Sequence, residues 1–198
     1  MTTEGLVFNE AEHSYRLNGR RLPSVTQVLD FYNDFSMVRE DVMELARWRG
    51  SLVHHITELY DKDDLIEENV EEWAVPYLAA WKRFRADTQF KIREIEVPRA
   101  SESYGYAGTL DRLGAIGRHE WVIDIKGGAV PHTAGLQTAA YRRLIPGNYV
   151  DHIRRATVQL KKDGTYALLE WKREDDWATF HSMLKIHTWL QLEDKRGS

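Results

Sequence analysis

The spacing of apolar residues changes near residue 90, and this change constrains the fold more than any other feature of the sequence. Between residues 38 and 87, apolar side chains recur at the spacing that is typical of amphipathic helices. From Ile92 to Val97, apolar and charged residues alternate instead, as they do in a half-buried strand. Segments of both kinds follow. The sequence therefore predicts an α/β (α+β) fold in which helices flank a central mixed β-sheet.

Turn and capping signals divide the chain into elements. Asn18-Gly19 and Asp163-Gly164 favour tight hairpin turns, Gly117 lies in a third turn, and Ser24 is a preferred N-cap residue. The expected helices cover residues 24–32, 38–61, 70–87, 133–144 and 174–193. The expected strands cover residues 8–17, 20–23, 92–97, 105–113, 120–125, 153–160 and 166–171. We expect one domain over residues 1–198, made of an N-terminal hairpin with a short helix (1–37), a helical part (38–90), a mixed-sheet core (91–172) and a C-terminal helix (173–198).

The composition excludes several classes of site. The chain has no cysteine, so a disulfide framework, a thiolate zinc site, a cysteine-ligated iron–sulfur cluster and a cysteine nucleophile are excluded. No apolar run approaches the roughly 20 residues that a membrane-spanning helix needs. The first residues lack the basic and apolar blocks of a signal peptide. We therefore expect a cytoplasmic protein with no membrane partner.

The charges are unevenly distributed. The formal net charge is -4, but residues 61–72 alone hold seven acidic residues against Lys62. Residues 137–162 hold six basic residues against Asp151. Such a basic stripe can bind phosphates even on an acidic protein, because the local field matters more than the total charge. The alternative is an ordinary solvated surface.

Asp111, Asp124 and Lys126 form the most informative group. Asp124 interrupts the apolar run 122–125, and an unpaired aspartate is costly to bury. Lys126 lies two residues later and therefore on the same face of a strand. Asp111 lies at the end of the preceding strand, and if the two strands pair through the turn near Gly117, both carboxylates can converge on one point. Two converging carboxylates suit Mg²⁺ or Mn²⁺, and a lysine beside them can stabilise negative charge. The alternative is a structural Asp–Lys ion pair.

Two helical pairs could complete such a site. His54 and Glu58 are four residues apart and share a helix face, and an imidazole would favour Mn²⁺. His55 competes with His54 for this role, and the spacing does not decide between them. Gln137 and Tyr141 share a face of the helix that follows the Asp124 strand, where they could orient a phosphate, a base or Lys126. Without the other motifs, both helices read as ordinary amphipathic helices.

Together these pieces resemble the PD-(D/E)xK nuclease superfamily, and most closely its RecB-type branch, which includes small phage exonucleases and the mitochondrial single-strand exonuclease. The motifs of that branch occur here in order as Gly50 to His54, Gly108-Thr109-Leu110-Asp111, Asp124-Ile125-Lys126 and Gln137 to Tyr141. Residues 22–29 also resemble the segment that often precedes this core in small phage members. The resemblance covers roughly residues 8–172. It implies a restriction-endonuclease-like domain.

The resemblance implies a role for each matching residue. His54, Asp111 and Asp124 would be metal ligands together with the carbonyl of Ile125, and Lys126 would be the catalytic lysine. Gln137 and Tyr141 would support the site, whereas Glu58 matches no ligand and is kept as a residue that contacts the ligands. The sequence departs from the pattern in two ways. Leu110 stands where the superfamily's name has proline, and the four cysteines of the iron–sulfur-containing relatives are absent.

We therefore expect a Mg²⁺- or Mn²⁺-dependent deoxyribonuclease, more specifically an exonuclease that prefers single-stranded DNA or DNA ends and acts in recombination, repair or replication. DNA is the expected partner, and a recombination or replication protein is a further one. Arg142, Arg143, Lys161 and Lys162 are candidates for contacts with the DNA backbone. The alternatives are a catalytically inactive DNA-binding or recombination-partner module with the same fold, and a metal hydrolase acting on a small phosphate ester.

Overall fold

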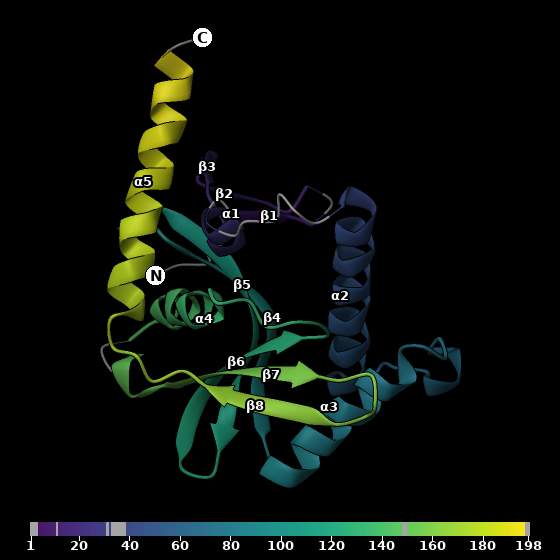
Figure 1. Cartoon of the computed structure of the whole chain (residues 1–198). Coiled ribbons are helices and arrows are strands. Elements are labelled where there is room, and N and C mark those ends of the chain that lie inside the picture. Colours follow the sequence, from purple (N-terminus) through teal and green to yellow (C-terminus); the bar gives the residue numbers. More distant parts are fainter. Residues whose placement is uncertain (1–3, 11, 31, 33–38, 148–149, 197–198) are drawn as a thin grey trace.

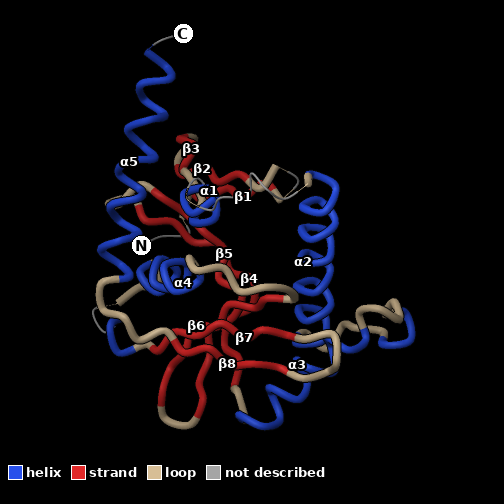
Figure 2. The backbone as a smooth tube through the Cα atoms, viewed as in Figure 1, coloured by secondary structure: helices blue, strands red, loops and turns tan. Residues whose placement is uncertain are grey.

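A five-stranded mixed sheet forms the centre of the protein (Figures 1 and 2). The computed structural model describes residues 4–10, 12–30, 32, 39–147 and 150–196. The strands lie in the order β4 (Lys91–Ser101), β5 (Tyr106–Ile116), β6 (His119–Lys126), β7 (Arg154–Leu160) and β8 (Tyr166–Glu170). β6 and β7 are parallel, and all other neighbours are antiparallel. The predicted α/β class with a mixed sheet is confirmed.

Helices cover both faces of this sheet. α4 (Ala134–Arg143) connects the parallel strands β6 and β7 and packs with α1 (Val25–Asp30) and α5 (Asp176–Arg196) on one face. α2 (Glu40–Asp61) and α3 (Val75–Thr88) lie on the other face. Each face has its own buried core. The first is built around Leu110, Val122, Leu144, Ile153 and Phe180, and the second around Trp81, Phe84, Ile123, Ile125 and Val158.

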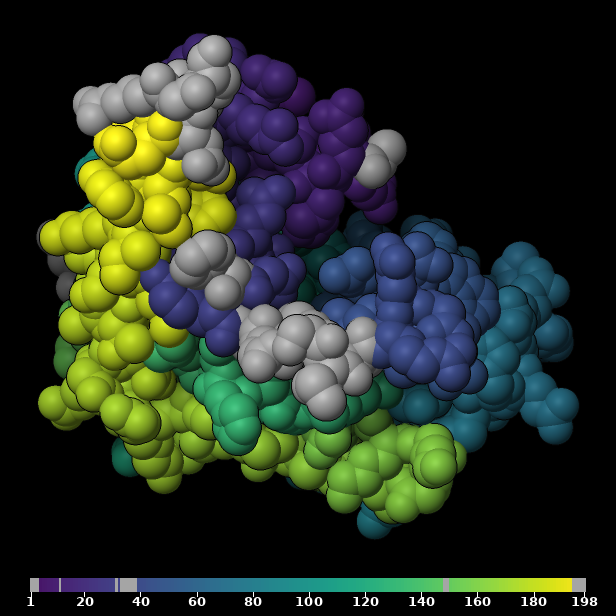
Figure 3. Space-filling model, turned by 45° about the horizontal axis from the view of Figure 1, so that its top comes forward, coloured from purple at the N-terminus to yellow at the C-terminus, as the bar shows by residue number. Residues whose placement is uncertain are grey.

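A small N-terminal sheet packs against the end of β5. It consists of β1 (Leu6–Asn9), β2 (Ser14–Leu17) and β3 (Arg20–Leu22). Asn18 and Gly19 have φ values of 49° and 81°, as the predicted tight turn between β2 and β3 requires. The Tyr15 hydroxyl lies 2.7 Å from the Thr109 hydroxyl, which fixes this sheet to β5. On the face shown in Figure 3, the surface is hollowed between these N-terminal strands (purple) and α2 (blue).

The helix α1 begins with the predicted cap. Ser24 Oγ accepts a hydrogen bond from the backbone N–H of Gln27, and Gln27 Oε1 accepts one from the N–H of Ser24, both at 3.0 Å. This reciprocal pair satisfies two donors that the first helical turn leaves free. The helix ends at Asp30, two residues before the predicted end.

Several predicted boundaries are wrong, three of them by more than an end residue or two. The strand predicted over residues 8–17 is two strands, β1 and β2, because the chain reverses between them, where His13 has a φ of 45°. The third long helix begins at Val75 instead of residue 70, and residues Glu67–Asn69 form a separate 3₁₀ helix, η1. β4 is longer than predicted, because it pairs with almost the whole of β5. A second 3₁₀ helix, η2 (Val150–His152), precedes β7.

A buried arginine joins the helices of the second face to the sheet. Arg112 on β5 is fully buried, and its Nε donates to Asp61 Oδ2 of α2 at 2.7 Å. Its Nη1 donates to Glu96 Oε1 of β4 at 2.9 Å. The guanidinium also lies over the ring of Trp81, on α3, at 5.6 Å. One side chain therefore connects α2, α3, β4 and β5.

No helix in the described part of the chain has both the length and the apolar composition that a membrane crossing requires.

Arg112→Gln should lower the free energy of unfolding by about 3 kcal/mol, because it leaves the buried Asp61 carboxylate without its closest cation. Urea denaturation followed by circular dichroism measures this. Arg93→Gln is the control, since Arg93 forms an exposed ion pair with Glu120 whose loss should cost less than about 1 kcal/mol. Equal losses in the two variants would contradict the role assigned to Arg112.

Candidate metal centre

The site lies where β5 and β6 separate. Their paired register ends at Arg112 and Ile123, so Asp111 and Asp124 are the next residues along the two strands. Asp111 Oδ2 accepts a hydrogen bond from the backbone N–H of Ile125 at 2.7 Å. This side-chain bond takes the place of the backbone hydrogen bonds that join β5 and β6 up to the pair Arg112–Ile123. The structure thereby brings the two predicted carboxylates to one point, where both are buried.

His54 reaches this point from α2. Its Nε2 lies 2.9 Å from the carbonyl oxygen of Ile125, and its Nδ1 lies 3.4 Å from Glu96 Oε1 and 3.7 Å from Asp111 Oδ2. A histidine that donates from one ring nitrogen to a carbonyl presents the other nitrogen in a fixed direction, as metal-binding histidines do. His54, Glu96 and Asp111 each offer one ligand atom, and these atoms lie within 4.8 Å of one another.

This donor set fits a divalent cation. One imidazole nitrogen and two carboxylate oxygens suit Mn²⁺, and carboxylate oxygens also suit Mg²⁺. The set overlaps with the predicted ligands in His54 and Asp111. The Ile125 carbonyl, predicted as a ligand, accepts a bond from His54, and Asp124 Oδ1 accepts one from Lys126. Their role as ligands stays a prediction. The three residues therefore form a candidate metal site without identifying the metal.

Glu96 is the member that the sequence did not reveal. It lies between the register pairs Ile95–Arg112 and Val97–Leu110, opposite Asp111, and its φ of 48° is unusual for a residue with a side chain. In an alternating strand, a glutamate normally faces solvent, so the pattern gave no reason to single it out. Only the irregular backbone and the strand opposite reveal its position.

Asp124 and Lys126 form the second half of the site. Lys126 Nζ donates to Asp124 Oδ1 at 2.8 Å. Thr157 Oγ1 on β7 donates to Asp124 Oδ2 at 3.3 Å, and the indole N–H of Trp171 donates to Thr157 Oγ1 at 3.0 Å. Neighbouring strands thus fix the carboxylate that in turn holds the lysine, and the Lys126 side chain remains 22% exposed.

Tyr141 lies close enough to the two aspartates to feel their charge, and Gln137 contacts Tyr141. Gln137 Nε2 donates to the Tyr141 hydroxyl at 3.0 Å, and both residues are buried. The Tyr141 ring packs on Gly108, where an added Cβ would come within 2.8 Å of it. Burial and the carboxylates of Asp111 and Asp124 raise the pKa of Tyr141, so its hydroxyl stays protonated. Tyr141 is therefore a neutral hydrogen-bonding group near the site.

Glu58 and His55 lie apart from this centre. Glu58 Oε1 accepts a bond from Lys62 Nζ at 2.5 Å, and its other oxygen lies 4.0 Å from His55 Nδ1. The side chain of His55 is 60% exposed. The structure therefore places His54 at the site instead of His55, and it places Glu58 in a surface ion pair with Lys62.

The four basic residues predicted to contact DNA lie in two places. Arg142 and Arg143 end α4 and line a pocket together with Arg154, the first residue of β7. Lys161 and Lys162 follow the last residue of that strand and are exposed. β7 has seven residues, so about 20 Å of strand lies between Arg154 and Lys161. The four residues therefore lie in two clusters, and their contact with the DNA backbone stays a prediction.

The ionisable groups of the site are coupled through their charges. Burial lowers the pKa of His54, but the carboxylates of Asp111 and Glu96 outweigh it and raise the pKa to about 9. Burial also lowers the pKa of Lys126, while Asp124 and Asp111 raise it, with a net increase. Both side chains are thus cationic at neutral pH when no metal is bound.

Comparisons with known proteins assign no family to this chain. No family model matches the chain, and no curated protein matches it either. Among solved structures, it is similar to the crystal structure of SSO0001, with 17% identity and a TM-score of 0.39 over 84% of each chain. The chemistry of the site therefore has to be derived from its own residues.

The affinity for Mn²⁺ should rise about tenfold per pH unit between pH 6 and pH 8. His54 is protonated throughout this range, so a metal that binds its Nδ1 must displace a proton. Isothermal titration calorimetry measures the affinity and, in buffers of different ionisation enthalpy, the released proton.

His55→Ala is the matched control and should keep the full pH dependence, whereas His54→Ala should lose affinity and flatten the remaining slope. An affinity that does not change with pH in the unaltered protein would contradict coordination by His54.

Proposed function

We propose that this chain is a metal-dependent DNA nuclease that hydrolyses phosphodiester bonds. The observation that carries the proposal is the meeting of two groups at the point where β5 and β6 separate. One group is the donor set of His54, Glu96 and Asp111, and the other is the ion pair of Lys126 and Asp124. Hydrolysis of a phosphodiester needs such a combination, because negative charge accumulates on the phosphate oxygens in the transition state.

The residues of the chain have distinct tasks in this reaction. A bound divalent cation supplies Lewis-acid chemistry, since it lowers the pKa of a water molecule and offsets phosphate charge. Lys126 stays protonated and partly exposed, so its ammonium group can contact a phosphate oxygen. Asp124 positions Lys126, and Thr157 positions Asp124. Gln137 and Tyr141 offer neutral donors beside them.

The order of the motifs along the fold supports the same reading. Gly50 to His54 lie on α2, Gly108 to Asp111 on β5, Asp124 to Lys126 on β6, and Gln137 to Tyr141 on α4. This helix–strand–strand–helix order resembles the RecB-type branch of the PD-(D/E)xK nucleases. From that resemblance we take the finer proposal of an exonuclease for single-stranded DNA or DNA ends, in recombination, repair or replication. Mg²⁺ or Mn²⁺ is the proposed cofactor, and the exposed Lys161 and Lys162 remain proposed contacts to the DNA backbone.

Digestion of end-labelled single- and double-stranded DNA tests the proposal. The unaltered protein should cut DNA with Mg²⁺ or Mn²⁺ and leave it intact with EDTA. Lys126→Ala and Asp124→Ala should each lower the rate at least about 100-fold, because they remove the charge stabilisation at the phosphate or the group that orients it. The order in which labelled products appear gives the polarity of an exonuclease.

Glu58→Gln is the control for this experiment, since Glu58 lies on the same helix as His54 but pairs with Lys62 at the surface. It should cut at the rate of the unaltered protein. Intact DNA under all conditions, with binding retained, would overturn the nuclease proposal and leave an inactive DNA-binding module.

A further inference from the structure

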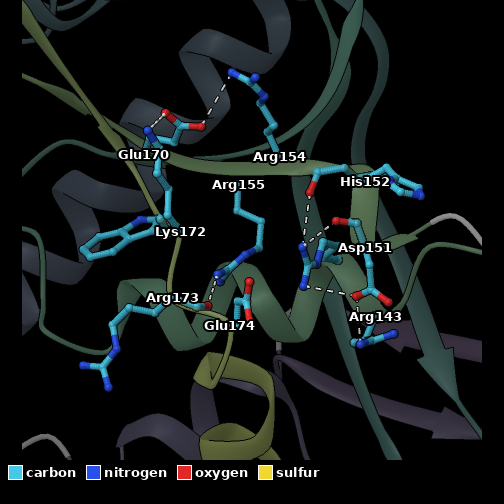
Figure 4. A pocket seen from close by; sticks show the side chains of 12 residues that line it. Arg143, Asp151, His152, Arg154, Arg155, Glu170, Lys172, Arg173 and Glu174 are labelled. Carbon is cyan, nitrogen blue, oxygen red and sulfur yellow. Dashed lines mark hydrogen bonds and ion pairs between the residues drawn. The ribbon is translucent and has the colours of Figure 1, made fainter.

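A polar pocket lies at the start of β7, apart from the metal centre. It has a volume of about 490 Å³ and is enclosed by the end of α4, η2, the start of β7 and the segment after β8 (Figure 4). Arg154 in its wall precedes Thr157, the register partner of Asp124, by three residues. This corresponds to about 10 Å along the strand, so the pocket and the metal centre are separate sites.

Positive charge dominates the wall of this pocket. Its six cationic side chains are Arg142, Arg143, Arg154, Arg155, Lys172 and Arg173. Its acidic side chains are Asp151, Glu170 and Glu174. The wall thus carries an excess of three positive charges, which come from three separate segments of the chain. The fold therefore brings together basic residues that are far apart in the sequence.

The arginines differ in how well they are paired. Arg155 is buried and fully engaged, since it donates to the carbonyls of Gly135 and Arg173 and to Asp176 at 2.7–3.0 Å. Within the described part of the chain, Arg142 makes polar contacts of 3.3–3.4 Å, with Asp151 and the Ile153 carbonyl. The Nε atoms of Arg142 and Arg143 are buried and have no hydrogen-bond partner among the described residues. Arg142 and Arg143 are therefore cations with unused donor capacity.

The surroundings of Arg142 disfavour its positive charge. Burial lowers its pKa, and the guanidiniums of Arg155 and Arg143 lower it further, against the opposing effect of Asp151 and Asp176. Buried cations that repel one another gain more from a bound anion than solvated cations do. The site thus has the electrostatic character of an anion-binding pocket.

Asp151 stands where an anion would bind. One of its carboxylate oxygens lies 2.8 Å from Arg143 Nη2 and 3.4 Å from Arg142 Nη2, and its side chain is 61% exposed. Figure 4 shows Asp151 beside Arg143, with a dashed line between the carboxylate and the guanidinium. An exposed ion pair of this kind contributes little, so a ligand with more charge can displace it.

We propose that this pocket binds a phosphate group, with Arg142 and Arg143 as its donors. Guanidinium groups bind phosphate oxygens in pairs, and several of them around one cavity favour a multiply charged phosphate over a single carboxylate. The volume is large enough for a pyrophosphate or a nucleotide. The site does not depend on the proposed nuclease activity, because no residue of the metal centre takes part in it.

Calorimetric titration with inorganic pyrophosphate, in the presence of EDTA, tests the proposal. The unaltered protein should bind it, Arg143→Gln should weaken binding about tenfold, and Asp151→Asn should strengthen it about fivefold, because that change removes the competing carboxylate. Lys161→Gln is the matched control: it removes one positive charge at the far end of β7 and should change the affinity less than twofold. Arg142→Gln, at the second proposed donor, replaces Arg143→Gln if that variant does not fold.

Two outcomes would overturn the proposal. One is no binding of pyrophosphate to the unaltered protein at about 10 mM, well above the range of specific sites. The other is an affinity that Arg143→Gln or its replacement Arg142→Gln leaves unchanged, or that Asp151→Asn weakens. Once binding is shown, a nucleoside 5′-monophosphate and an oligonucleotide with and without a 5′-phosphate distinguish a small ligand from a nucleic-acid end.

Discussion

The buried guanidinium of Arg112 is the interaction on which the arrangement of the metal centre depends. It is fully buried between Asp61 of α2 and Glu96 of β4, and it follows Asp111 directly along β5. The ion pair with Asp61 holds α2 against the sheet, and α2 carries His54. The Glu96 carboxylate touches both Arg112 and His54, so the structural network and the candidate ligand set share one group. The strand ladder between β5 and β6 ends at Arg112 and Ile123. The carboxylates of Asp111 and Asp124 therefore lie where the two strands separate.

Charge balance explains how so many ionised groups coexist in this part of the protein. The acidic groups are Asp61, Glu96, Asp111 and Asp124, and the cationic groups in contact with them are Arg112, Arg85, His54 and Lys126. Burying any one of these charges alone would be costly, whereas opposed pairs offset that cost. A divalent cation can enter only if it replaces positive charge that is already present. His54 loses its proton more readily than Lys126, because the pKa of His54 is about 9 and that of Lys126 is raised above the ordinary value for lysine.

The sequence predicted most of the fold and part of the site, and the differences have physical causes. Local signals such as Asn18-Gly19 and the Ser24 cap predicted their turn and helix start correctly, because neighbouring residues alone determine them. The carboxylate of Glu96 and the guanidinium of Arg112 could not be assigned, since a charged residue in an alternating strand normally faces solvent. Their burial depends on α2 and α3, which pack on that face. The pocket around Arg142 likewise depends on segments that are distant in the sequence.

The two polar sites are linked through the β6–α4–β7 unit. α4 carries Gln137 and Tyr141 beside the metal centre and ends in Arg142 and Arg143 at the pocket. Trp171, in the pocket wall, donates to Thr157, which donates to Asp124. Two hydrogen bonds therefore connect the wall of one site with a carboxylate of the other.

A crystal structure of the protein grown with Mn²⁺ tests the central claim most directly, because anomalous scattering locates the ion. The account predicts a peak about 2.2 Å from ligand atoms of His54, Glu96 and Asp111, close to Lys126. A fully occupied peak elsewhere, or none at saturating Mn²⁺, would contradict the assignment of this site as a metal centre.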